Sequence, residues 1–155
     1  MEGMPEFGYS FTQYNEVSDV RGSLREVDVS PKEAREVAEF IKGMSLDKAK
    51  SVLQEVIEMK RLVPFRRYHK KVAHHKIDGF YAGRYPVKAA KLFLKLLENL
   101  EANALYKGFD VSRLVIIHAA AYPGRKLVRY VPRAFGRRSP KRRVYVHLEA
   151  VARVI

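Results

Sequence analysis

Residues 111–152 read VSRLVIIHAAAYPGRKLVRYVPRAFGRRSPKRRVYVHLEAVA, and they determine the architecture of this chain. The two ends alternate in side-chain character, which predicts strands over residues 111–121 and 144–152. Because these strands are consecutive, we expect them to pair antiparallel. Their connection, residues 122–142, is far longer than an ordinary hairpin loop of two to five residues. Its β-branched and aromatic side chains favour a protruding two-stranded ribbon, which we expect to be mobile until a partner orders it.

The same connection carries the densest positive charge in the chain. No acidic residue lies between Asp110 and Glu149, whereas residues 125–143 contain nine Lys and Arg side chains. The formal net charge is +13, and it is unevenly distributed. Residues 1–60 hold twelve acids and eight bases, while residues 61–155 hold five acids and twenty-two bases. So many like charges need a polyanion outside the protein, which makes nucleic acid the leading partner.

The remaining sequence predicts one short strand and three helices. Alternation predicts the strand over residues 24–29. Capping signals and apolar spacing predict helices over residues 31–42, 45–61 and 86–107. The expected fold class is therefore α+β, with about three antiparallel strands packed against three helices and a long protruding basic β-hairpin. We treat residues 1–155 as a single domain.

Three segments of this domain are expected to lie outside its core: an N-terminal arm (1–20), a basic inserted loop (63–85) and the extended hairpin (122–142). We expect the inserted loop to be irregular. The arm is aromatic, and the sequence leaves open whether a partner surface orders it or whether it is a frayed terminus. Its aromatic residues are Phe7, Tyr9, Phe11 and Tyr14.

Histidines in this chain invite two alternative interpretations. His69, His74 and His75, with Asp78, form a conceivable metal site, but adjacent histidines point apart and the chain has no cysteine. RNA or solvent contacts are favoured for them, and we predict no metal and no cofactor. His118 and His147 are expected to face each other across the sheet and to hydrogen-bond locally, with His118 on the same side as Leu114 and Ile116.

Catalysis and membrane insertion are disfavoured. Acidic residues cluster in the first two helices, where Glu36 and its neighbours are expected on solvated faces, and no nucleophile has an adjacent base. We therefore predict no catalytic residues and no enzyme. No apolar run approaches the roughly 20 residues that span a bilayer, so we expect no membrane partner and a cytoplasmic location. Lys88, Lys91 and Lys95 line one helix face, and the sequence leaves open whether this face contacts solvent or phosphate.

Residues 132–137, PRAFGR, resemble the loop-tip signature of a large-subunit ribosomal protein family, L-twenty-two, called L-seventeen in the eukaryotic naming. Residues 101–104, EANA, also match the pattern of that family, as do Gly124-Arg125 ahead of Arg129 and the closing strand. The resemblance covers residues 21–151. The N-terminal arm and the insert are similar to the archaeal and eukaryotic branch, and we expect an archaeal-type member.

That resemblance implies a structural constituent of the large ribosomal subunit. Such a protein binds large-subunit ribosomal RNA, supports subunit assembly and lines the polypeptide exit tunnel with its hairpin. The implied partners are large-subunit ribosomal RNA, neighbouring ribosomal proteins and the nascent polypeptide, and the protein is not expected to form a homo-oligomer. The alternative is a non-ribosomal RNA-binding or ribosome assembly factor that uses the same ribbon.

Charge and resemblance together give two sets of candidate residues. Phe135 departs from the arginine common in bacterial members, so the charge and width of the tip are expected to differ here. The expected RNA-binding residues are Arg66, Arg67, Lys70, Lys71, Arg84, Lys88, Arg125, Lys126, Arg129, Tyr130, Arg133, Arg137, Arg138, Lys141, Arg142 and Arg143. The expected tunnel-tip residues are Val131, Pro132, Arg133, Ala134, Phe135, Gly136 and Arg137.

Overall fold

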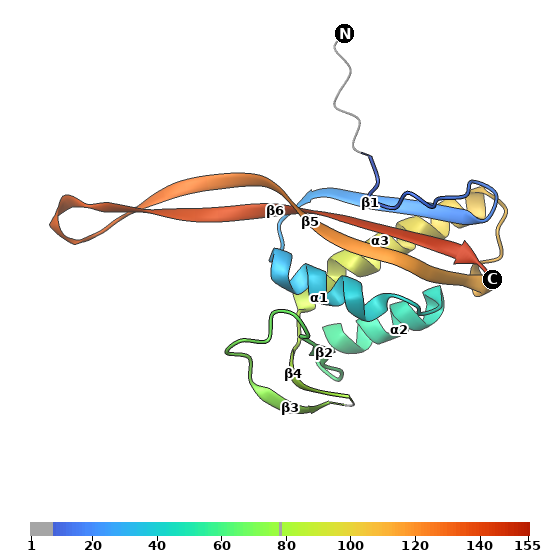
Figure 1. Ribbon diagram of the computed structural model, residues 1–155, viewed down its shortest axis with the longest axis horizontal. Helices are drawn as coiled ribbons and strands as arrows, with labels where there is room; N and C mark the ends of the chain where they lie inside the picture. The colour runs from blue at the N-terminus through green and yellow to red at the C-terminus, as the bar shows by residue number, and fades with distance from the viewer. Residues whose placement is uncertain (1–7, 78) are drawn as a thin grey trace, which may run out of the picture.

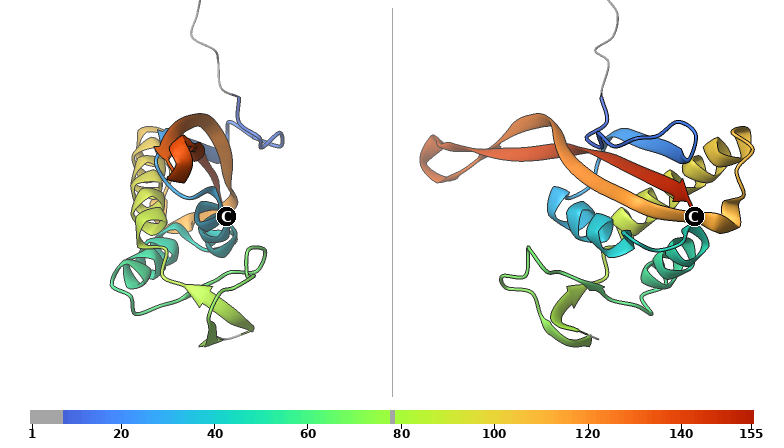
Figure 2. Two further views of the ribbon diagram at one scale, coloured as in Figure 1. Left: turned by 90° about the vertical axis from the view of Figure 1, so that its left-hand side faces the viewer. Right: turned by 45° about the vertical axis from the view of Figure 1, so that its right-hand side comes forward.

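Three antiparallel strands form the central sheet of the protein, in the order β1-β6-β5. The computed structural model describes residues 8–77 and 79–155. Three helices lie together on one face of this sheet (Figures 1 and 2). The strands are β1 (Asp19–Val27), β5 (Leu114–Pro132) and β6 (Arg138–Val154), and the helices are α1 (Pro31–Ile41), α2 (Leu46–Ile57) and α3 (Val87–Tyr106). The predicted α+β class is confirmed.

Apolar spacing on the helices explains how they cover the sheet. The stripe on α3 recurs every three to four residues and places Phe93, Leu97 and Leu100 in the core with no exposed surface. Helix α3 packs against β1 and β6, while α1 packs against β5 and α2 packs against α3. At the start of α1, Pro31 occupies the first turn after Ser30, where its missing N–H costs nothing.

Strand β5 contains a bulge that reverses part of its expected pattern. Ile117 is one extra residue, because Ile116 and His118 pair with consecutive residues of β6. Beyond the bulge Ala119 faces the core, and it is 1% exposed. The prediction that His118 shares a side with Leu114 and Ile116 is therefore wrong. A strictly alternating pattern takes no account of an inserted residue, so it assigns every side chain after the bulge to the wrong face of the strand.

The long hairpin is confirmed. Strands β5 and β6 remain paired as far as Pro132 and Arg138, well beyond the helices that cover the sheet (Figure 1). None of the residues 122–143 is buried. We call the part of this hairpin from residue 124 to residue 145 the ribbon. Its mobility in the free protein stays a prediction.

The N-terminal arm lies on the face of the sheet opposite the helices. The backbone N–H of Ser10 donates to the buried carboxylate of Glu149 on β6, at 3.1 Å. The ring of Phe11 lies 5.3 Å from that of His118, and the guanidinium of Arg21 lies 4.8 Å from the Tyr9 ring centroid. The described part of the arm is thus held by the chain's own sheet. Phe7 lies outside the described residues.

Residues 63–85 fold into a second, smaller sheet, which corrects the prediction of an irregular loop. Its strands are β2 (Val63–Pro64), β3 (His74–Ile77) and β4 (Phe80–Arg84), in the order β2-β4-β3. We call residues 63–85 the insert. Apolar residues scattered among its cations anchor it, because they are buried in the common core. These anchors are Val63, Phe65, Val72 and Ala82.

An ion pair between neighbouring strands β1 and β6, with its carboxylate buried, makes stability depend on pH. Arg153 donates to the fully buried carboxylate of Asp19 through Nε at 2.6 Å and Nη2 at 2.8 Å. These hydrogen bonds, aided by the backbone N–H of Asn15 and opposed by desolvation, lower the pKa of Asp19 from 3.8 to about 2. A lowered folded-state pKa means that the pair stabilises the fold above pH 3.8 and loses this effect as pH falls toward 2.

We expect Asp19→Asn to lower the free energy of unfolding at pH 7 by about 1–3 kcal/mol, because one buried charged acceptor is lost. Since the asparagine does not titrate, the difference from the wild type should shrink between pH 4 and pH 2. Chemical denaturation at a series of pH values measures this difference. A gap that stays constant down to pH 2 would contradict the assigned role of the pair.

Candidate nucleic-acid interface

Every residue that the sequence predicts for RNA binding is exposed to solvent. The structure divides these residues between two places. One group lines the ribbon, and the other lies on the insert and at the start of α3 (Figure 1). Helix α1 and the loop that precedes it lie between the two groups.

Cations cover both faces of the ribbon. Cross-strand partners share a face, so Arg129 and its partner Lys141 lie on one side. Arg142, paired with Val128, lies on the other side, as does Arg138. Like charges placed directly opposite each other destabilise a strand pair. A ribbon with this layout gains most when polyanion lies against both of its faces, rather than when it rests flat on one surface.

The tip of the ribbon is a tight turn that projects an aromatic ring. The backbone N–H of Arg133 donates to the carbonyl of Arg137 at 2.8 Å and closes the turn. Phe135 has φ 59° and ψ 35°, the left-handed region that costs a non-glycine residue about 1–2 kcal/mol. Its side chain is 94% exposed. The turn therefore holds a large apolar ring in solvent at a conformational cost.

Tyr130, predicted as a stacking surface for RNA, already has a partner inside the ribbon. The guanidinium of Arg138 lies 4.5 Å from its ring centroid. Even so, 57% of Tyr130 remains exposed. The cation orders the ring and leaves a large part of its surface available.

A glycine lies at the root of the ribbon, where two side chains approach its Cα closely. A second bulge places Gly124 and Arg125 opposite the single residue Tyr145. A Cβ atom at Gly124 would lie 2.6 Å from Nε2 of His147 and 2.7 Å from Oε1 of Glu26, closer than real Cβ atoms approach. The Gly124-Arg125 pair that matches the family pattern therefore has a structural reason.

Two of the predicted RNA-binding cations are already paired with a carboxylate. Arg143 donates through Nε to Oδ1 of Asp28 at 2.8 Å and through Nη2 to Oδ2, and Nζ of Lys88 lies 2.8 Å from the same Oδ2. Hydrogen bonds from Arg143 first, and then from Lys88, lower the pKa of Asp28 from 3.8 to about 2. Asp28 thus links the base of the ribbon to the start of α3, a link that sequence patterns did not reveal.

Asp28→Asn is expected to strengthen RNA binding, because Asp28 competes with phosphate for Arg143 and Lys88. The slope of log affinity against log salt should become more negative by about 1, because these cations become available to phosphate. Filter binding of large-subunit ribosomal RNA between 50 mM and 400 mM salt measures both effects. Weaker binding by the variant would instead mean that Asp28 orients the two cations for RNA.

The insert is positioned by a buried carboxylate on α1. Glu36 is 1% exposed, and its two oxygens accept the backbone N–H groups of Arg66, Arg67 and Tyr68 at 3.1, 3.0 and 2.9 Å. The prediction that Glu36 lies on a solvated face is wrong. It lies next to the buried Val37, and the insert covers it. This contact holds the backbone of the insert in place while the Arg66 and Arg67 side chains remain exposed.

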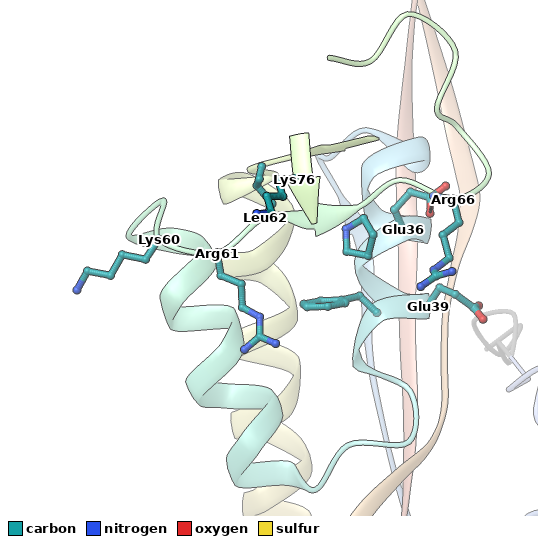
Figure 3. A pocket seen from close by; sticks show the side chains of 9 residues that line it. Glu36, Glu39, Lys60, Arg61, Leu62, Arg66 and Lys76 are labelled. Atoms are coloured by element: carbon teal, nitrogen blue, oxygen red, sulfur yellow. Dashed lines mark hydrogen bonds between the residues drawn. The ribbon is translucent and has the colours of Figure 1, made fainter. Parts of the chain in front are cut away.

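Two hollows beside the insert are lined by cations that sequence patterns did not single out. One, of about 460 Å³, lies between the end of α2 and the insert, with Arg61 on one side and Arg66 on the other (Figure 3). The second, of about 550 Å³, runs between α1, the insert and the ribbon root, so that it joins Arg67 to Lys126. Sequence patterns gave these extra cations no assigned role. They are Lys32, Arg35, Lys42, Lys60, Arg61 and Lys76.

Neither a metal site nor a membrane-spanning helix is found among the described residues. Across 8–77 and 79–155, no three His, Cys, Asp or Glu side chains form a possible metal site. His69 and His74 contact Tyr81 edge-on, and Asp78 lies outside the described residues. Nε2–H of His118 donates to the carboxylate of Glu149 at 3.1 Å, and Nε2 of His147 lies 3.2 Å from Oε1 of Glu26, so the two histidines have separate local partners. In the part of the chain that is described, no helix combines the length and apolar character needed to cross a bilayer.

Comparison with known proteins gives one family over nearly the whole chain. The model of the family Ribosomal protein L22p/L17e matches residues 22–153. The chain is 52% identical over 150 residues to large ribosomal subunit protein uL22 of Cenarchaeum symbiosum, covering 97% of this chain and 99% of that protein. For uL22 of Nitrosopumilus maritimus the identity is 49% over 152 residues, covering 98% and 100%. For uL22 of Archaeoglobus fulgidus it is 46% over 152 residues, covering 97% and 98%.

Proposed function

Because this chain belongs to the Ribosomal protein L22p/L17e family, we propose that its ribbon is embedded in ribosomal RNA and that the ribbon tip lines the polypeptide exit tunnel. The protein is a structural, non-enzymatic constituent of the large ribosomal subunit. Its partners are therefore ribosomal RNA and other proteins of that subunit. The proposal concerns which of its surfaces meet which partner.

The observation that carries the proposal is the distribution of charge on the ribbon. Cations lie on both faces, and Asp28 is the acidic partner found for them at the ribbon root. A ribbon that is charged on both faces fits a channel between RNA segments. Arginine suits the walls of such a channel, since its guanidinium binds phosphate with two parallel hydrogen bonds. The insert and α3 supply a second set of contacts through Arg66, Arg67 and Lys88.

The protein should recognise the folded shape of the RNA more than its base sequence. Phosphate contacts give affinity that falls steeply with salt. Folded RNA is recognised mostly through its backbone geometry and its unpaired bases. The exposed tip, with Phe135 held outward, supports a position where the ring meets a passing chain rather than a packed core.

A disulfide cross-link tests the position of the tip. The chain has no cysteine, so Phe135→Cys introduces a unique thiol. In ribosomes stalled with a nascent chain that carries one cysteine, we expect a cross-link to form only when that cysteine is a fixed number of residues from the peptidyl-transfer centre. Tyr106→Cys, at the exposed end of α3, is the matched control and should not react. Absence of any cross-link across all nascent-chain lengths would rule out a tunnel position for Phe135.

A further inference from the structure

Four aromatic rings of the insert gather together, one from β3, two from β4 and one from the turn before β3. Phe80 and Tyr81 stack with ring centroids 4.7 Å apart and an interplanar angle of 28°. His74 and His69 contact Tyr81 edge-on, with centroids 5.0 Å and 6.1 Å away. Tyr81 nevertheless remains 46% exposed. The cluster thus supports an aromatic ring without covering it.

Contacts with the core beneath it position this ring cluster. Phe65 and Ala82 are 2% and 0% exposed, and the Phe65 N–H donates to the Ala82 carbonyl at 2.9 Å, tying the start of the insert to β4. Nδ1–H of His69 donates to the carbonyl of Arg66 at 2.8 Å, which sets the orientation of that ring. Since Glu36 anchors the same turn, Tyr81 has a prepared position and loses little freedom when a ligand covers it.

The positive charges around the ring cluster indicate which class of ligand it binds. The guanidinium of Arg66 lies 5.4 Å from the Phe80 ring centroid. Lys70, Lys71 and Lys76 are exposed on the same insert. In the sequence, Asp78 is the only acidic residue between Glu58 and Glu98. A half-exposed aromatic ring within a field of cations matches a nucleotide, because the base can stack while its phosphates meet Lys and Arg.

We propose that Tyr81 is the stacking platform for one unpaired base of an RNA loop or bulge. This rests on the proposed RNA-binding function and adds a second mode of contact to it. The ribbon reads the phosphate backbone, whereas Tyr81 binds a base that has left its helix. Stacking tolerates any base, so the platform selects for an unpaired state and not for a particular nucleotide.

The test uses the full-length chain and a single-stranded RNA of twelve nucleotides with 2-aminopurine at its centre, alone or in a duplex. The chain has no tryptophan, so it adds little emission of its own. We expect the wild type to quench the single-stranded probe. Tyr81→Leu should weaken binding roughly five- to 150-fold and lose the quenching, while Tyr81→Phe should retain both. Tyr106→Leu removes an equally apolar but distant exposed ring and should behave as the wild type.

The salt dependence of binding separates this inference from the function on which it rests. Tyr81→Leu removes no charge, so the slope of log affinity against log salt should match that of the wild type. Unchanged affinity and quenching in Tyr81→Leu would overturn the platform, whereas a wild type that binds no RNA at all would overturn the proposed function. Photocrosslinking of the wild type to 5-iodouridine RNA gives an independent readout that does not depend on how a variant folds. A cross-link on Tyr81 is expected, and cross-links that avoid the insert contradict the proposal.

Discussion

Glu36→Ala is expected to lower the free energy of unfolding by about 3 kcal/mol or more and to detach the insert from α1. The carboxylate is 1% exposed and accepts three backbone N–H groups, from Arg66, Arg67 and Tyr68. Its loss leaves three donors without their acceptor, and an unsatisfied buried donor costs about 1–3 kcal/mol. Because water can reach a detached insert and satisfy some of these donors, the total should stay below the sum of three such costs.

Two measurements follow the consequences of this substitution separately. Chemical denaturation gives the loss of stability, and hydrogen exchange should show faster exchange at the amides of residues 66–68. Glu39→Ala is the matched control, since Glu39 lies one turn away on the same helix and is 45% exposed. It should change stability by less than about 0.5 kcal/mol. Equal effects of the two substitutions would show that Glu36 is not an anchor.

Buried carboxylates have a shared role in the described part of this chain. Asp19, Glu36 and Glu149 are its buried charged side chains. Each binds a segment that has no helix or strand of its own at the point of contact. Asp19 accepts the N–H of Asn15, Glu149 accepts that of Ser10, and Glu36 holds the turn at the start of the insert. The protein thus uses its few buried acids to fasten irregular segments to the core, while its cations stay outside.

Sequence patterns predicted the parts of the fold that follow a regular period. The apolar stripe of α3 and the long hairpin depend on local spacing, and both were predicted. The bulge at Ile117 was missed because one inserted residue leaves no compositional sign. The role of Glu36 was missed because its partners, the amides of residues 66–68, are thirty residues away and carry no side-chain signature. The insert was predicted as a loop because its anchors are single apolar residues, such as Phe65, dispersed among cations.

The candidate site was predicted in the same uneven way. Exposure of the predicted cations follows from charge alone, since an unpaired Arg or Lys is rarely buried. The pairing of Arg143 and Lys88 with Asp28 depends on tertiary contact between three distant segments. No local pattern encodes that contact. The cations of α1, such as Lys32, joined the surface only because the insert folds beside that helix.

Neutralising three cations on the ribbon is expected to reduce affinity for ribosomal RNA roughly a hundredfold at 0.1 M salt. The variant carries Arg129→Gln, Lys141→Gln and Arg142→Gln, which lie on both faces of the ribbon. If each contacts one phosphate, the slope of log affinity against log salt should fall by about 2–3. Thermal stability should not fall, because these side chains are exposed and Arg129 opposes Lys141 directly.

A control with the same change in net charge decides whether position matters. Lys48→Gln, Lys50→Gln and Arg113→Gln remove three cations from α2 and from the turn before β5, outside the ribbon, the insert and both hollows. Because none of these three cations lies on the ribbon or lines a hollow, their loss should change the release of counterions on RNA binding very little. If the affinity for RNA depends only on the total charge of the protein, the slope of log affinity against log salt should fall equally in both variants. If RNA is bound along the ribbon, the control should retain most of the wild-type slope, and only the ribbon variant should show a slope that is shallower by about 2–3.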